Sequence, residues 1–186
     1  MKNKFIRFFL FVMTGLALVS FDFDKAEGWG KAGSKPNSYD MGIDKGAGQD
    51  GKNCASIKSK DKRIQGFGTL MQNFAPDKYV GKKIRMTGFM KSKDVDKWAG
   101  FWLRMNKTDS KTILDNMYPT CKGNTEWTKY ELVLEVPETT KNIAFDALLN
   151  GKGQIWFNNI NFEIVDNSVP STKKVKEEPT NLNFDK

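Results

Sequence analysis

Trp102 and Arg104 are the residues whose types and spacing point most directly to binding chemistry. They alternate with Phe101 and Leu103, and successive side chains of a β-strand point to opposite faces of the sheet. Trp102 and Arg104 therefore share one face of a predicted strand, ~6.6–6.8 Å apart. An indole ring stacks on apolar C–H surfaces, and a guanidinium donates hydrogen bonds in a fixed fork. This pair suits a ligand that has both apolar faces and hydroxyl groups.

The same alternation gives further outward side chains in three predicted strands, namely Arg85, Phe89, Asn106 and Asp146. An amide and a carboxylate would add hydrogen-bond acceptors to the ring and the forked donors. Two interpretations remain open for this set. The residues form a binding face, or the two arginines and Asp146 form a structural ion-pair network with Trp102 packed over it.

Catalysis is limited by composition, because the chain contains no histidine. Histidine-dependent triads, histidine-ligated zinc and histidine-ligated haem are therefore excluded. Glycoside hydrolysis needs only two carboxylates, but Glu131 and Glu135 alternate on a solvated strand face. A single small sandwich also leaves little room for a deep cleft. We predict a non-catalytic protein without a cofactor.

The N-terminus is typical of a secretory signal peptide. Lys2, Lys4 and Arg7 precede an apolar run over 8–19, which is short for a membrane span. We predict that residues 1–20 are a signal peptide and that the protein is secreted or periplasmic; an uncleaved N-terminal anchor is the alternative. Cleavage would lower the formal net charge from +8 to +5, because three basic residues and no acid are lost.

The remaining lysines are scattered along the chain instead of forming one cluster. A nucleic-acid-binding protein usually gathers basic residues on one face, so we predict no nucleic-acid partner and membrane contact only through an uncleaved signal. Cys54 and Cys121 are the only cysteines. In an exported protein they either form a disulfide or remain two buried thiols, and both alternatives stay open.

The rest of the chain divides into a connector at 21–38, a region of short apolar runs at 39–166, and a flexible polar tail at 167–186. The runs are separated by Gly, Asp, Asn and Pro and predict eight strands, at 39–44, 54–59, 66–74, 82–90, 99–106, 128–136, 143–149 and 154–165. Such a series favours an all-β sandwich or barrel. In the last run the alternation changes phase at Asn158–Asn159, which predicts a β-bulge.

The closing run GQIWFNNINFE at 153–163 resembles the aromatic-Asp-Asp/Asn-Val signature that ends the jelly-roll modules of the galactose-binding-like group, which includes many carbohydrate-binding modules. A closer resemblance is to a bacterial version found alone or appended to transcriptional regulators. That resemblance rests on the segments at 66–72, 98–104, 115–117 and 123–128. No helix-turn-helix pattern is present, so a regulator's activity does not carry over.

The resemblance implies an eight-stranded jelly-roll β-sandwich. Its topology would place six residues on the non-core face of one sheet as a ligand site, namely Arg85, Phe89, Trp102, Arg104, Asn106 and Asp146. The ligand would be a carbohydrate or another small polar molecule. Many such modules hold a structural calcium through an Asp where this chain has Asn158 and Asn159, so we predict no metal. The alternative function is a structural or protein-interaction module at the cell surface.

Overall fold

The computed structural model describes residues 23–107, 112–116 and 118–172, without the side chains of 113–116. The predicted signal peptide at 1–20 lies outside these residues. The described chain forms two short 3₁₀-helices, η1 (Pro36–Ser38) and η2 (Gln49–Gly51). It also forms nine strands: β1 (Gly30–Ala32), β2 (Tyr39–Asp44), β3 (Cys54–Ser59), β4 (Phe67–Phe74), β5 (Lys83–Asn106), β6 (Thr112–Asn116), β7 (Thr120–Glu135), β8 (Asn142–Asn150) and β9 (Gln154–Val165). Neither helix is long and apolar enough to cross a membrane.

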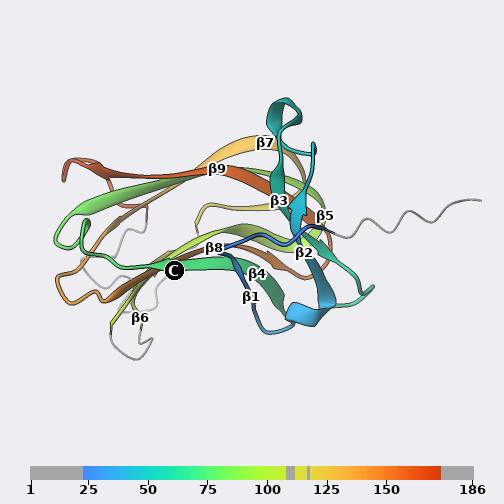
Figure 1. The fold of residues 1–186 in the computed structure, drawn as a ribbon, viewed down its shortest axis with the longest axis horizontal. Coiled ribbons are helices and arrows are strands. Elements are labelled where there is room, and N and C mark those ends of the chain that lie inside the picture. The colour runs from blue at the N-terminus through green and yellow to red at the C-terminus, as the bar shows by residue number, and fades with distance from the viewer. Residues whose placement is uncertain (1–22, 108–111, 117, 173–186) are drawn as a thin grey trace, which may run out of the picture.

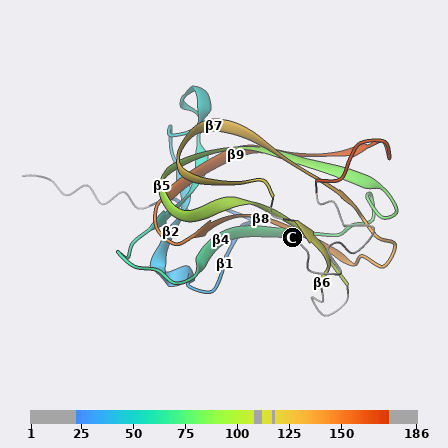
Figure 2. The ribbon, with the colours of Figure 1, turned by 180° about the vertical axis from the view of Figure 1, so that it is seen from behind.

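Strand β5 belongs to both layers of a β-sandwich. Its first half pairs with β9 and β7, and its second half pairs with β8 and β6. The β9 layer contains β2, β3, β9 and the first half of β5, with most of β7; the β8 layer contains β1, β4, β8 and the second half of β5, with β6. Figures 1 and 2 show β7 and β9 in one layer and β4 and β8 in the other. The predicted all-β jelly-roll sandwich is confirmed.

The number of strands differs from the expected eight. The predicted strands 82–90 and 99–106 are two halves of the 24-residue β5, and β1 and β6 are additional. The charged residues between the two halves have the composition of a turn, yet the strand continues through them and Val95 is buried. Asp94, with φ 53°, and several register shifts allow the strand to bend from one layer into the other.

The core lies between the two layers and follows the predicted alternation. Met86, Phe101 and Leu103 are fully buried, as the sequence pattern indicates. Phe101 makes edge contacts with Tyr130 and Phe157, at ring-centroid distances of 6.2 and 6.0 Å. Gly88 gives the Phe101 ring its space, because a Cβ at that position would lie 2.7 Å from the ring. A side chain at position 88 would therefore push the two halves of β5 apart.

The predicted bulge in the closing strand is confirmed. Thr87 pairs with Asn161 and Phe89 pairs with Asn158, so β9 has one more residue than β5 over this interval. Asn159 has φ 53°, the left-handed conformation that Asn tolerates better than most residues. The extra residue explains why the apolar side chains of β9 change phase.

Both predicted flanking segments contain residues that pack on the sandwich. In the predicted connector, β1 pairs with β4, and the Trp29 ring contacts Phe145 and Phe157 at 5.3 and 5.8 Å. In the predicted tail, Thr172 exchanges hydrogen bonds with the backbone of Val133. The described end of the chain therefore covers part of the free edge of β7.

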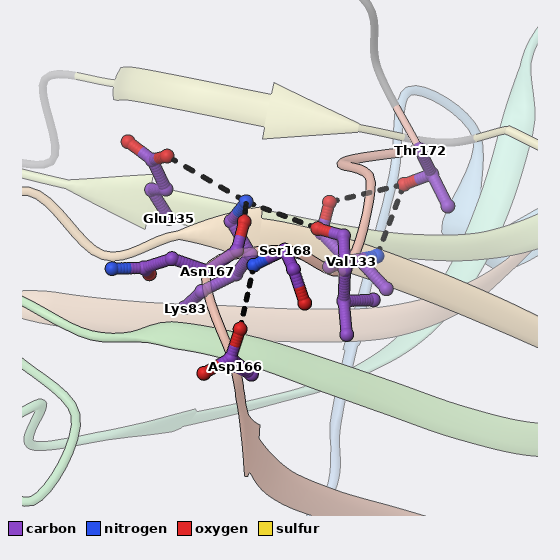
Figure 3. Close-up of polar contacts among 8 residues, drawn as sticks. Lys83, Val133, Glu135, Asp166, Asn167, Ser168 and Thr172 are labelled. Carbon is purple, nitrogen blue, oxygen red and sulfur yellow. Dashed lines mark hydrogen bonds and ion pairs between the residues drawn. The ribbon is translucent and has the colours of Figure 1, made fainter.

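Lys83 also binds this C-terminal segment (Figure 3). Its side chain is buried, and Nζ donates to the carbonyl oxygens of Asn167 and Val169 at 2.9 and 3.0 Å. Glu135 Oε1 lies 3.8 Å from the same amine. A buried ammonium needs such acceptors, so the segment and the lysine stabilise each other.

Cys54 and Cys121 are free, buried thiols, which decides between the two alternatives left by the sequence. Burial, with a smaller contribution from Asp44, raises the pKa of Cys54 to about 12. The thiolate is the reactive form, so both cysteines should react with a disulfide reagent such as DTNB far more slowly in the native protein than in urea. Fast reaction of both thiols under native conditions would contradict this burial.

Candidate functional site

The six residues predicted to form one site lie on two different layers. Trp102, Arg104, Asn106 and Asp146 are on the outer face of the β8 layer, since the second half of β5 pairs with β8. Arg85 and Phe89 are on the outer face of the β9 layer. The prediction of one shared face is therefore wrong for these last two. The reason is the bend in β5, which carries the two halves of one strand into opposite layers.

Arg85 has a structural role in the β9 layer. Its Nε lies 3.2 Å from Glu131 Oε2, and its Nη1 lies 2.9 Å from Glu163 Oε1. These two carboxylates come from the strands on either side of β5. Arg85 therefore links three strands and is not the partner of Asp146. The alternative prediction, an ion-pair network that joins Arg85, Arg104 and Asp146, is wrong for Arg85.

Asp146 and Trp102 form the centre of the candidate site. They are directly opposite in the register of β8 and β5, with Met71 of β4 on the other side of Asp146. Opposed residues have Cβ atoms about 4.5–5.5 Å apart, so their side chains are neighbours on this face. The guanidinium carbon of Arg104 lies 4.7 Å from the centroid of the Trp102 ring. This arrangement stacks a cation on one part of the aromatic ring.

A second row extends the site along the same face. Asn150 of β8 lies opposite Trp98 of β5, with Phe67 of β4 on its far side. Between the two rows lie Leu148 and Gly100, and Gly100 adds no side chain. We call the outward residues Trp98, Gly100, Trp102, Arg104, Asp146, Leu148 and Asn150 the tryptophan face.

The predicted site included neither Asn150 nor Trp98. Both follow from alternation once the strands are extended by one residue, because Trp98 and Trp102 have the same parity, as do Asp146 and Asn150. Four residues of strand separate the two tryptophans by about 13 Å. Asn106, by contrast, is buried and bonded to Asn142 and Thr112, which indicates a structural role at the end of the face.

Four polar atoms of the tryptophan face are buried without a hydrogen-bond partner among the described residues, namely Trp102 Nε1, Arg104 Nε, Asp146 Oδ1 and Asn150 Oδ1. Two of these atoms are donors and two are acceptors. A buried polar atom without a partner costs roughly 1–3 kcal/mol, and most such atoms in native proteins are paired. Their concentration on one face makes this face the candidate site.

Asp146 is the buried carboxylate of this face, and its surroundings favour the protonated form. Burial raises its pKa to about 7, while a hydrogen bond with Thr69 and the charge of Arg104 act in the opposite direction. The carboxyl group therefore donates a hydrogen bond at mildly acid pH and only accepts at alkaline pH.

The residues around the closing strand do not fit the calcium site that the resemblance implies. Asn158 and Asn159 line a cavity of about 380 Å³ together with Glu27 and Asn53. Calcium takes six to eight oxygen ligands, usually with several carboxylates. Glu27 is the one carboxylate among the described residues of this lining, and the described chain has no group of three or more His, Cys, Asp or Glu placed to hold a metal.

We therefore expect the melting temperature to be the same in EDTA and in added CaCl₂. An ion that binds the folded state would stabilise it by about 2.7 kcal/mol at one hundred times its Kd. Differential scanning calorimetry after exhaustive dialysis checks this. A clear loss of stability in EDTA, restored by Ca²⁺, would show that amide and backbone oxygens suffice for a site here.

Comparison with solved structures agrees with the fold. No family model matches the chain. The N-terminal module of Clostridium thermocellum xylanase 10B, solved as a CBM22-1–GH10 protein with xylohexaose, has a TM-score of 0.58 and 12% identity over 74% of this chain and 26% of that chain. The CBM22-1 xylan-binding domain of Paenibacillus barcinonensis Xyn10C has a TM-score of 0.56 and 10% identity over 78% of this chain and 90% of that one. The fold is that of a carbohydrate-binding module.

One curated relative shows similarity in sequence. An uncharacterized HTH-type transcriptional regulator of Bacillus subtilis (strain 168), YbfP, is 39% identical over 169 residues, which is 87% of this chain. The chain spans 57% of that regulator's length. This match agrees with the resemblance, drawn from the sequence motifs, to a module appended to transcriptional regulators.

Proposed function

We propose that this jelly-roll module binds a neutral carbohydrate along the tryptophan face. The observation that carries the proposal is the group of four buried, unpartnered polar atoms at Trp102, Arg104, Asp146 and Asn150. Sugar hydroxyls both donate and accept hydrogen bonds, so a saccharide can satisfy two donors and two acceptors at once. A simple anion or metal cation would leave two of them unpaired, and an apolar ligand would leave all four unpaired.

The shape of the face favours an oligosaccharide as the ligand, and not a single sugar ring. Trp98 and Trp102 are both half-buried, and Gly100, which has no side chain, lies between them along the strand. A separation of about 13 Å allows each indole to stack on a different ring of one oligosaccharide. Xylan binding by the Paenibacillus module and the xylohexaose complex of the Clostridium protein support xylo-oligosaccharides as the first ligands to try.

The proposed activity is binding without catalysis. Asp146 is the one carboxylate that the described side chains place on the tryptophan face, and hydrolysis of a glycosidic bond needs two. Asp115 is opposite Arg104 in the register of β6, with its side chain outside the described residues. The described residues contain no α-helix, so the HTH type named in the relative is not part of the proposal.

Export belongs to the same proposal. The basic start and short apolar run of residues 1–20 support a cleaved signal peptide, so the mature chain should begin between residues 18 and 27. Mass spectrometry of the protein recovered from its native cells checks this. An intact Met1 would contradict cleavage.

A glycan array with the full chain tests the proposed function, followed by thermal shift with the saccharides that bind. We expect at least one neutral oligosaccharide to raise the melting temperature in a concentration-dependent way. If no saccharide binds and a protein co-purifies at a fixed ratio, the interaction-module alternative is correct and the proposal is wrong.

A further inference from the structure

The outer face of the β9 layer carries a second set of polar and aromatic side chains. The register places Lys58, Gln154 and Lys93 in one row across β3, β9 and β5. The next row contains Trp156 between Ser56 and Lys91. Residues two apart on a strand share a face, so both rows point outward, away from the core and from the tryptophan face.

Two hollows adjoin these rows and share Lys93 as a wall. The first, about 400 Å³, is lined by Trp156, Lys91, Asn124 and Glu126 among others. The indole of Trp156 is held in place there, because its Nε1 donates to Asp44 Oδ2 at 2.8 Å. An oriented and half-buried ring is the usual platform for a sugar.

The second hollow, about 350 Å³, is rich in cations. Lys58, Lys93 and Lys152 line it with Asp94 and Gln154. Lys58, Lys93 and Lys152 have no ion-pair partner among the described residues, whereas the described Lys91 is paired with Glu126 at 3.4 Å. Three ammonium groups and the single carboxylate of Asp94 give the described lining of this hollow a net positive charge, which attracts an anionic group.

From this juxtaposition we infer a second binding site, which takes a saccharide that carries a carboxylate, such as a uronic acid. The sugar ring lies in the first hollow against Trp156, and the carboxylate lies in the second hollow among the three lysines. Lys93 contacts both parts of the ligand because it lines both hollows. This site is independent of the neutral ligand proposed for the tryptophan face on the opposite layer.

Oligogalacturonate is the probe, and NMR of the full chain at the tryptophan indole N–H groups is the measurement. The probe should shift the Trp156 signal and leave the Trp102 signal unchanged. Lys93→Ala should weaken binding about tenfold, the range for hydrogen bonds to charged groups. Lys31→Ala removes the same charge from an exposed position in β1, in the other layer, and should leave the affinity unchanged. Raising the salt concentration should weaken the binding further.

Three results would overturn the inference. They are no shift of Trp156 at millimolar probe, a shift of Trp102 in its place, or an equal loss of affinity in Lys31→Ala and Lys93→Ala. A neutral xylo-oligosaccharide serves as the second ligand. The neutral ligand should shift the Trp102 signal, and the acidic ligand should shift the Trp156 signal. The proposed function and this inference are therefore tested by different signals.

Discussion

Replacing Trp102 with alanine will remove most of the affinity for a neutral saccharide and leave the protein folded. The ring is half-buried on the outer face and its Nε1 has no partner in the described structure. Aromatic anchors of this kind commonly contribute 2 kcal/mol or more to binding, about thirtyfold in Kd. Isothermal titration calorimetry and urea melts of the same sample measure the two effects separately.

Arg85→Ala is the matched control for Trp102→Ala. Arg85 lies on the opposite layer in partly exposed ion pairs with Glu131 and Glu163. Such pairs are worth about 0–1 kcal/mol, so this variant should bind normally and lose little stability. If Trp102→Ala instead costs about 3 kcal/mol or more in folding, as loss of core packing does, Trp102 is structural.

Replacing Asp146 with asparagine will stabilise the protein at alkaline pH and change its pH dependence. The native carboxyl group has a pKa of about 7, whereas the ordinary value of an aspartate side chain is 3.8. Between these values the unfolded chain loses its proton while the folded protein keeps it, so stability falls as the pH rises from about 4 to 7. The integrated loss is about 4 kcal/mol, from 1.36 kcal/mol for each pKa unit.

The asparagine variant lacks this ionisation, so its stability should exceed that of the wild type at pH 8.5 and approach it at pH 4.5. Urea unfolding at both pH values checks the prediction. Asp40→Asn is the control, since Asp40 is an exposed partner of Lys60 and its replacement should leave the fall in stability unchanged. Equal stability differences between Asp146→Asn and wild type at both pH values would contradict the burial of this carboxylate.

Much of the fold could be predicted from alternation alone. Ile84, Phe101 and Leu132 are buried as the period of two requires, and the bulge at Asn159 follows from the change of phase. Alternation is local information, because the sequence of each strand by itself indicates which of its faces meets the core. Which strands lie side by side is a separate matter, decided by long-range pairing.

The candidate site was predicted only in part for that reason. Trp102, Arg104 and Asp146 do lie together, because β8 pairs with the second half of β5. Arg85 and Phe89 do point outward, as their alternation predicts, but they lie on the β9 layer and not on the β8 layer. The stretch from Lys91 to Lys97 has a turn-like composition, so nothing local indicated one continuous strand that changes layers.

The indole N–H signal of Trp102 tests the central claim most directly. In a ¹H–¹⁵N spectrum, assigned with Trp102→Phe, xylohexaose or another neutral oligosaccharide that binds in the array should shift this signal at saturation. Trp156 is the internal control, because its Nε1 is already bonded to Asp44 on the opposite layer. A Trp102 signal that stays in place while a neutral saccharide binds would contradict the assignment of the tryptophan face as the binding site.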